Sequence, residues 1–375
     1  MARLETIQPD VSLGKKTKEK IREDLIRSEI INKYKKPAFK RPDALTQPKS
    51  SELLSPAERA SELMLDLHLQ VSPTLSNIVD HGIGRQPIGK VSGRKGEDSL
   101  IGIDEIADLL VRDALKELTK KHKLSLAVFS EHGTYIIGEG RPEFFIALDP
   151  YENSDEYEKG LDTNGHLVAT IYDMNDQPVA AGDSNLVSQH AVINYHNNNW
   201  ELNNKTREAK QLFPPRLVRS ISDPKCVIAC YIGRDKYSRP FNANLDRLNK
   251  DRNPKSTFHG KAGTHIYEAL VRGAVSANVM IGSSRENRGE PVSEVWPAKG
   301  LLLKNSKIKI YSVDKEDGHL EELKMNHKRY LDNPNHYAKD RIDFLISANP
   351  ELARQIRNYA FTKPFPGWND FVGKL

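Results

Sequence analysis

Acidic side chains stand where the sequence predicts that strands end. The apolar segment FFIAL at 144–148 indicates a buried strand, and Asp149 and Glu152 follow it directly. Glu131 likewise follows LAVFS at 126–130. Charged groups are costly beside a buried strand unless a cation pairs with them. The pattern therefore predicts a positively charged partner at these strand ends.

Further acids lie at the other kind of element boundary, at or just before the start of a predicted helix. They are Glu97, Asp98, Asp104 and Glu294. Any one of these acids alone would more simply be a helix cap or a surface charge. Several carboxylates together offer the hard oxygen ligands that Mg²⁺ and Mn²⁺ prefer. We therefore expect a bound metal to supply the positive charge.

The residues after Pro150 predict a second property of this region. The segment ENSDEY at 152–157 reads as the start of a short helix, which leaves the backbone N–H groups of Asn153, Ser154 and Asp155 free for a ligand. Helix N-termini bind phosphate oxygens. A metal held by Asp149 and Glu152 would lie beside the same phosphate, as metal-assisted hydrolysis of a phosphate ester requires.

Composition bounds the class of protein. The chain has 375 residues, 29% charged and 38% hydrophobic, which is enough for one large domain or two small ones. It contains no run of about 18 apolar residues that would predict a membrane helix, and its start lacks the apolar core of a signal peptide. We expect a cytoplasmic protein without membrane contact. Cys226 and Cys230 fit buried thiols in a reducing compartment better than a two-thiol zinc site.

The net charge of +5 is concentrated near the N-terminus. Residues 15–41 hold eleven Lys/Arg and four Asp/Glu, a local +7, which leaves about −2 for the rest. We expect residues 1–52 to be a basic extension that is solvated or contacts an anionic partner such as nucleic acid. The alternative is an arm that packs on the domain or at an interface between copies through four residues: Ile21, Leu25, Ile26 and Ile30.

A single domain is expected over 53–375, with halves at 53–220 and 221–375. Ser55 and Glu58 form a capping box before a helix that begins at Pro56 and should end before Pro73. A second helix is predicted over about 103–121. Strands then dominate up to 233, with a polar hairpin tip, NNNWELNN, at 197–204. Helices near 263–275 and 293–304 flank a strand at 277–282, so helices and strands mix as in layered α/β or α+β folds.

Four segments resemble, in order, the motifs of the inositol monophosphatase and fructose-1,6-bisphosphatase superfamily. They are GEDSLIGIDEIAD at 96–108, SEH at 130–132, ALDPYENS at 147–154 and SEVWPAKG at 293–300. The resemblance covers roughly residues 55–310. It implies a layered αβαβα fold and a Mg²⁺- or Mn²⁺-dependent phosphatase. The substrate would be a phosphate monoester of a small sugar, a polyol or a nucleotide.

The resemblance also implies roles for the acids. The metal ligands would be Glu131, Asp149, Glu152 and Glu294. Ser154, paired with Glu97 or Asp98, would orient the attacking water, and Asp104 belongs to the first motif of this catalytic group. The phosphate would lie against Asn153, Ser154 and Asp155.

This chain departs from the superfamily pattern where the motif Asp-Gly has become Glu152-Asn153. The extra methylene of Glu152 would shift a metal by about 1 Å, and a misplacement of that size can cost on the order of a hundredfold in rate. Asn153 can adopt the left-handed conformation that glycine provides. His132 replaces a second acid. The alternative function is therefore a catalytically weak member that binds a phosphorylated ligand or a protein partner.

Overall fold

The structure is a computed structural model. It describes residues 15–46, 54–90, 99–160, 165–213, 218–230, 257–259, 265–280, 290–302, 308–313, 319–342, 344–347 and 349–361. The chain divides into two compact units. Unit 1 comprises Met1–Gln211, Trp296–Leu301 and His327–Ala338, and unit 2 comprises the remainder. The predicted boundaries at 52/53 and 220/221 stay predictions.

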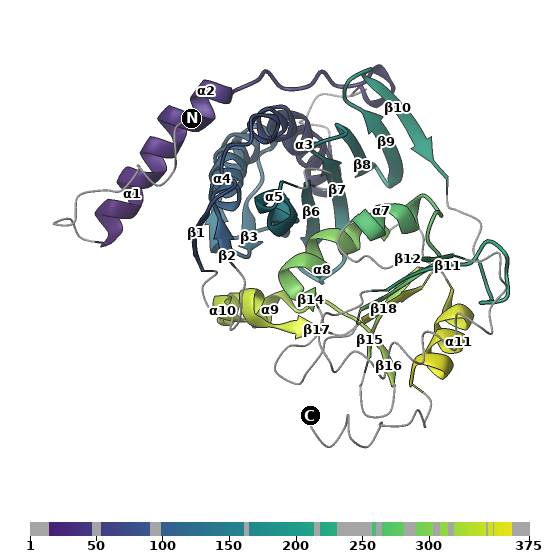
Figure 1. The fold of residues 1–375 in the computed structure, drawn as a ribbon. Helices are drawn as coiled ribbons and strands as arrows, with labels where there is room; N and C mark the ends of the chain where they lie inside the picture. Colours follow the sequence, from purple (N-terminus) through teal and green to yellow (C-terminus); the bar gives the residue numbers. More distant parts are fainter. Residues whose placement is uncertain are drawn as a thin grey trace. The chain divides into compact units, whose positions relative to one another are not determined.

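Unit 1 is built on a sheet whose described strands have the order β10-β9-β8-β7-β6-β5-β3-β4. Strands β6 to β10 of this sheet are labelled in Figure 1. β3 and β5 are parallel, and β5 through β9 pair in antiparallel fashion with their neighbours. The bounds are β3 Leu126–Ser130, β4 Gly133–Ile137, β5 Phe144–Glu152, β6 His166–Asp173, β7 Pro178–Asn185, β8 His190–Tyr195, β9 Asn198–Asn203 and β10 Glu208–Leu212. The polar segment predicted as a hairpin tip is mostly strand β9, a correction that follows from its pairing with β8.

Two long helices, α3 Pro56–Asp80 and α4 Gly102–His122, bury their apolar stripes on one face of this sheet. The capping box of Ser55 and Glu58 is present: Ser55 Oγ accepts from the Glu58 N–H, and Glu58 Oε2 accepts from the Ser55 N–H. Ile146 and Leu148 of β5 point into this core. A short ribbon, β1 Pro87–Lys90 with β2 Ser99–Ile101, precedes α4.

The prediction that α3 ends before Pro73 is wrong, because the helix continues to Asp80. Proline lacks the N–H that would bond to the carbonyl four residues earlier, so an interior proline usually breaks a helix. Here the carbonyl of Leu69 accepts instead from the backbone N–H of Phe39 at 2.9 Å. A distant segment thus satisfies the acceptor that Pro73 leaves open.

That segment follows an N-terminal helical stretch, α1 Lys15–Ile26, the π-helical turn η2 Arg27–Ile31 and α2 Asn32–Tyr34. Ile26 and Ile30 are buried in the same core as α3 and α4, with 0% and 1% of their surface exposed. Arg27 bonds to Asp113 of α4 at 2.8 Å. Over the described residues 15–46, the arm therefore packs on unit 1, which is the alternative to a solvated extension.

The opposite face of the sheet carries parts of unit 1 that come late in the sequence. Tyr172 of β6 donates to the carbonyl of Trp296 at 2.6 Å, and Thr170 accepts from the N–H of Gly300 at 3.1 Å. Phe129 and Phe145 stack there on aromatic rings of the later segments. The unit 1 segments concerned are Trp296–Leu301 and His327–Ala338. They belong to α8 Val292–Lys299, the 3-10 turn η6 Gly300–Leu302, α9 His327–Asp332 and α10 Pro334–Lys339.

Unit 2 contains a second sheet, with the described strands in the order β12-β11-β13-β18-β15-β16. Helix α11 Pro350–Phe361 packs Leu352 and Ile356 on Leu345 of β18. Cys226 is a buried thiol, whereas the side chain of Cys230 lies outside the described residues. The other bounds are β11 Val227–Cys230, β12 Thr257–His259, α7 His265–Val271, β13 Ala277–Met280, β14 Glu290–Pro291, β15 Lys309–Val313, β16 Leu320–Glu322, β17 Arg341–Ile342 and β18 Phe344–Ser347.

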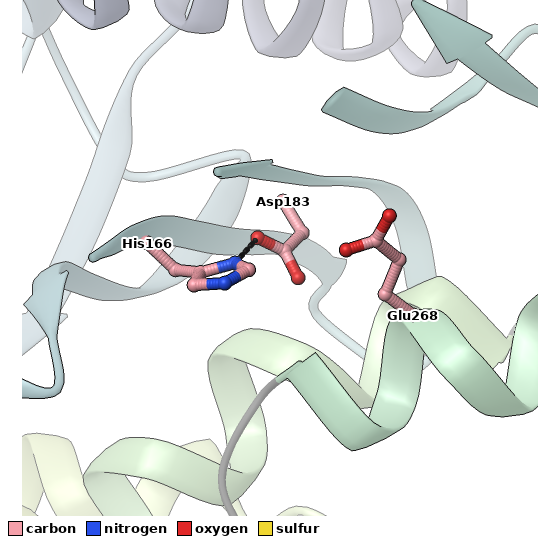
Figure 2. A group of neighbouring side chains, drawn as sticks. All are labelled: His166, Asp183 and Glu268. Carbon is pink, nitrogen blue, oxygen red and sulfur yellow. Dashed lines mark hydrogen bonds and ion pairs between the residues drawn. The ribbon is translucent and has the colours of Figure 1, made fainter. Parts of the chain in front are cut away.

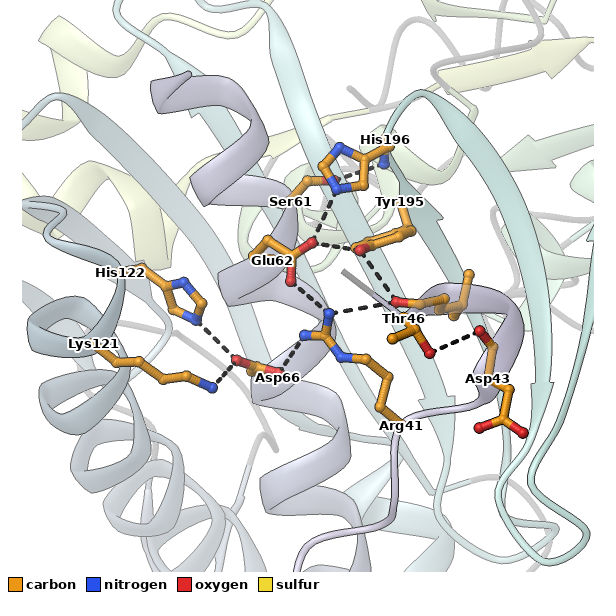
Figure 3. A network of polar contacts seen from close by, with 11 residues as sticks. Arg41, Asp43, Thr46, Ser61, Glu62, Asp66, Lys121, His122, Tyr195 and His196 are labelled. Carbon is orange, nitrogen blue, oxygen red and sulfur yellow. Dashed lines mark hydrogen bonds and ion pairs between the residues drawn. The ribbon is translucent and has the colours of Figure 1, made fainter. Parts of the chain in front are cut away.

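A network of buried charges fastens residues 41–46 to α3 and to the turn after β8 (Figure 3). Arg41 donates to Glu62 at 2.7 Å and to Asp66 at 2.8 Å. The side chain of Glu62 is fully buried and also accepts from Tyr195. His196 Nε2 lies 2.9 Å from the same Glu62 oxygen. On the other side, Asp66 contacts Lys121 at 2.6 Å and His122 at 2.9 Å, both at the end of α4.

These contacts lower the pKa of both carboxyl groups. Burial alone would raise the pKa of Glu62, but hydrogen bonds from Tyr195 and His196 and the charge of Arg41 outweigh it. Burial also opposes ionisation of Asp66, and hydrogen bonds from His122, Lys121 and Arg41 reverse that effect and hold its pKa well below the ordinary value. The ionised forms of both acids therefore stabilise the folded state.

Replacing Arg41 by methionine should lower the free energy of unfolding by about 3 kcal/mol, because it leaves buried carboxylates short of a partner. Denaturant unfolding at pH 7 measures the loss, with the exposed Lys35→Met as control. The ordinary carboxyl pKa values are 4.5 for Glu62 and 3.8 for Asp66, and the folded values lie lower. The advantage of the wild type should be complete above about pH 5 and shrink as the pH falls through the folded values. An equal difference at pH 7 and at about pH 3 would contradict this assignment.

Candidate active site

The parallel pairing of β3 and β5 brings two of the predicted acids together. The register places Ser130 opposite Leu148, so Glu131 and Asp149 follow at the same edge of the sheet on adjacent strands. Neighbouring strands lie about 4.8 Å apart. Tyr337 of α10 is near both: burial raises its pKa well above the usual range, and the charges of neighbouring tyrosines, Asp149 and Glu131 raise it further.

The end of β5 carries the third acid. The register of β5 against β6 shifts between Asp149 and Glu152, so the strand bulges there. The N–H of Tyr151 donates to Asp149 Oδ1 at 3.2 Å inside this bulge. Asp149 and Glu152 are each only 5% exposed. A bulge at a strand end redirects side chains locally, which is common beside active sites.

Asn153 turns the chain from β5 into a short helix, α5 Ser154–Glu158. Its φ of 69° and ψ of 35° are left-handed, as expected for a residue in the place of glycine. Its carbonyl accepts from the N–H groups of Glu156 at 3.1 Å and Tyr157 at 3.2 Å. Tyr157 is buried, and its hydroxyl donates to the carbonyl of Ile83 at 2.9 Å, which fixes α5 beside the end of α3.

The remaining predicted residues are placed separately or not described. Glu97 and Asp98 lie outside the described residues, as does the side chain of Asp155. Asp104 is buried in the first turn of α4, as expected for an acid that opens this helix. Glu294 lies in the first turn of α8 and is half-buried, within the part of the chain assigned to unit 2.

Sequence reasoning missed a buried histidine that lies opposite Glu152 in the β5–β6 register. His166 Nδ1 lies 2.7 Å from Asp183 Oδ1 (Figure 2). His166 Nε2 lies 3.2 Å from the amide nitrogen of Asn185. Because the amide can only donate, the ring accepts at Nε2 and donates from Nδ1. Side chains alternate between the two faces along β6 and β7, and this alternation was the signal that could have placed His166 and Asp183. Only the observed register shows that these residues share the face of Asp149.

His132 occupies the place where the superfamily pattern has a second acid. Its Nε2 lies 3.4 Å from Glu131 Oε1. His132 also lies near Glu105 in α4. Burial raises the pKa of Glu105, and the charges of Arg22 and His132 offset part of that rise. Arg22 bonds to Glu105 at 2.7 Å. The N-terminal helix thus supplies a cation near the edge of the site.

No protein-family model matches the sequence, and no curated protein does. Solved structures do match. The chain is 11% identical to a protein of Toxoplasma gondii assigned as a sedoheptulose-1,7 bisphosphatase, with a TM-score of 0.55 over 82% of this chain and 98% of that one. It is 11% identical to the extragenic suppressor protein suhB of Bartonella henselae, with a TM-score of 0.53 over 81% and 99%. It is 12% identical to an IMPase of Thermotoga maritima, with a TM-score of 0.52 over 84% and 96%.

The chain has the inositol monophosphatase fold. This confirms the fold that the four motifs implied, a layered arrangement of helices and sheets. The match extends over nearly the whole length of these structures, so both sheets take part in it. Among the described helices, none has the length and apolar character needed to cross a membrane.

The donor set at the strand ends suits a hard divalent cation. Glu131, Asp149 and Glu152 offer carboxylate oxygens, two of them from side chains that are 5% exposed. Oxygen ligands from carboxylates are those that Mg²⁺ and Mn²⁺ select over softer metals. The residues present therefore fit such an ion, with Asp149 between the other two along the chain.

Millimolar Mg²⁺ or Mn²⁺ should raise the thermal midpoint of unfolding, because a ligand bound only by the native state stabilises it. Asp149→Asn should abolish the metal-dependent rise by removing a central ligand. Asp24→Asn is the control, since Asp24 is exposed on α1 and its loss changes the net charge equally. A wild type whose midpoint ignores both metals would refute the metal site.

Proposed function

We propose that this chain is a metal-dependent phosphatase that hydrolyses a phosphate monoester of a small sugar, polyol or nucleotide. The observation that carries the proposal is the meeting of Glu131 and Asp149 at the ends of adjacent parallel strands, with Glu152 three residues further on. The fold supports it, because phosphatases share this architecture. Mg²⁺ or Mn²⁺ would activate water and neutralise charge on the phosphate.

The chain's own residues would bind and orient the reactants. Glu131, Asp149, Glu152 and Glu294 would hold metal. The backbone N–H groups of Asn153, Ser154 and Asp155 would face a phosphate oxygen. Ser154, with Glu97 or Asp98, would orient the water, and Asp104 would support this group from the first turn of α4. A carboxylate of this group would accept the proton of the attacking water.

The substrate class rests on the similar structures. The Toxoplasma gondii protein is assigned as a sedoheptulose-1,7 bisphosphatase, and the Thermotoga maritima protein is an IMPase. Both descriptions point to small phosphorylated compounds rather than to phosphoproteins. A cytoplasmic location and an assembly of several copies accompany this proposal as predictions.

The second candidate is a catalytically weak member that binds a phosphorylated ligand or a protein partner. The observation that favours it is Glu152-Asn153 in place of Asp-Gly. The backbone accommodates Asn153, since its left-handed conformation is kept. Glu152 is the remaining departure, because its longer side chain must place its oxygens correctly for a metal.

Phosphate release from a mixed panel of phosphate monoesters, with Mg²⁺ and with EDTA, tests the proposed function. The panel should include sugar bisphosphates, inositol monophosphates and nucleoside monophosphates. Metal-dependent turnover of at least one ester supports the phosphatase. Metal-dependent binding of an ester without turnover would instead support the weak member.

Variants of Glu152 test its role as a ligand. Glu152→Asp should keep or raise the rate, because it restores the shorter acid of the superfamily pattern. Glu152→Gln should lower the rate by about a hundredfold or more, because the amide removes the charge that a metal requires. The wild-type rate on the most active ester is the reference. Equal rates for all three proteins would exclude Glu152 from the metal site.

A further inference from the structure

A second site of a different character lies elsewhere in unit 1. An open pocket of about 540 Å³ is lined by the segment at 36–40, by α3 near Pro73 and by the turns after β7 and β9. None of the proposed active-site residues lines it. Its volume is within the range of about 300–1,000 Å³ typical of small-molecule sites.

The charge of this pocket is strongly positive. Four cations line it, Lys36, Lys40, Lys205 and Arg207, against the single acid Asp80, so the local charge is four minus one, or +3. Within the described part of the chain, none of the four cations forms an ion pair. Like charges gathered in a concave site concentrate a positive potential, which attracts anions.

The wall at 36–40 is held in place by specific bonds around the helix proline. Thr74 Oγ1 accepts from the N–H of Lys36 at 3.0 Å, and Phe39 bonds to the carbonyl that Pro73 leaves open. The Asn77 amide donates to the carbonyl of Tyr34 at 2.8 Å. The cations on this wall therefore project from a fixed backbone rather than from a loose chain.

The opposite wall consists of two turns of the same design. Asn185 Oδ1 accepts from the N–H groups of the second and third residues after it, and Asn203 Oδ1 does the same in the next turn. Each turn ends on a residue with a left-handed backbone, Gln189 with φ 60° and Arg207 with φ 63°. Turns of this kind usually have glycine there. Both turns instead carry a side chain that lines the pocket.

From these observations we propose that the pocket binds a small molecule carrying two or more phosphate groups. The four cations match the charge of such a ligand, and charge-assisted bonds to phosphate are the strong ones. The amides of Gln189, Asn204 and Asn77 offer further donors. Pro37 and Phe39 provide an apolar surface for the uncharged part of the ligand. The site is separate from the proposed active site and needs no metal.

Inorganic tripolyphosphate, titrated calorimetrically into the full chain in EDTA at low salt, tests the proposal. We expect saturable binding of one equivalent that weakens as salt is added. Arg207→Gly should weaken binding about tenfold by removing one charge. The same change relieves the left-handed backbone, so the thermal midpoint should stay or rise. If the midpoint is unchanged or higher, weaker binding by Arg207→Gly cannot result from unfolding of the variant.

A second pocket variant and two control variants complete the test. Lys205→Ala should weaken binding about as much as Arg207→Gly. Lys210→Ala, an exposed cation on β10 that does not line the pocket, should leave binding unchanged. Asp149→Asn should also bind as the wild type does. Unchanged affinity in both pocket variants, the absence of saturable binding, or loss of binding in Asp149→Asn would each overturn the proposal.

Discussion

The position of β5 between a parallel and an antiparallel neighbour determines which residues lie together at the candidate site of unit 1. Its parallel partner β3 brings Glu131 beside Asp149, and its antiparallel partner β6 places His166 opposite Glu152. Because side chains alternate along a strand, a slip of one residue would turn Asp149 into the helix-covered core. The apolar residues Ile146 and Leu148, which pack under α3 and α4, prevent that slip. The core therefore fixes the site.

Burying an acid requires a compensating charge or hydrogen bonds, and helix α3 of unit 1 shows one complete solution within the chain. Glu62 and Asp66 are compensated by Arg41, Lys121 and His122, and their low pKa values follow. These partners come from two separate segments, the stretch at Arg41 and the end of α4, so the network joins both segments to α3. Asp149 and Glu152 are also buried, and their carboxylates offer only oxygen donors. A divalent cation is the compensation that this donor set favours.

Local signals predicted much of this architecture. The capping box at Ser55, the amphipathic helix at 103–121 and the buried strand at 144–148 each encode their structure within a few residues, and each is present. The errors arose where a distant partner decides the outcome. Pro73 reads as a helix end until Phe39 supplies the missing donor. The polar residues 197–204 read as a tip until β8 pairs with them.

The candidate site also combines features that local sequence predicts with features that depend on distant partners. The motifs singled out the acids at 131, 149 and 152 as candidates because their spacing is local, and the register places them at the ends of β3 and β5. The contact of His166 with Asp183 was not predictable, because it depends on the register between two strands. The same holds for Gln189 and Arg207, since a sequence does not show which turn residues become left-handed.

The cations that give residues 15–41 their net charge of +7 fall into two groups with different surroundings. The arginines at 22, 27 and 41 bond to acids of α3 and α4 within unit 1. A planar guanidinium suits such fixed, partly buried pairs, whereas lysine remains strongly hydrated and mobile. The lysines at 33, 35, 36 and 40 are exposed. The arginines are thus paired with acids inside unit 1, whereas these lysines face solvent. Two of the lysines, Lys36 and Lys40, line the pocket around Pro73. The segment that completes the helix at Pro73 is the segment that makes the pocket basic, so folding and anion attraction are inseparable there.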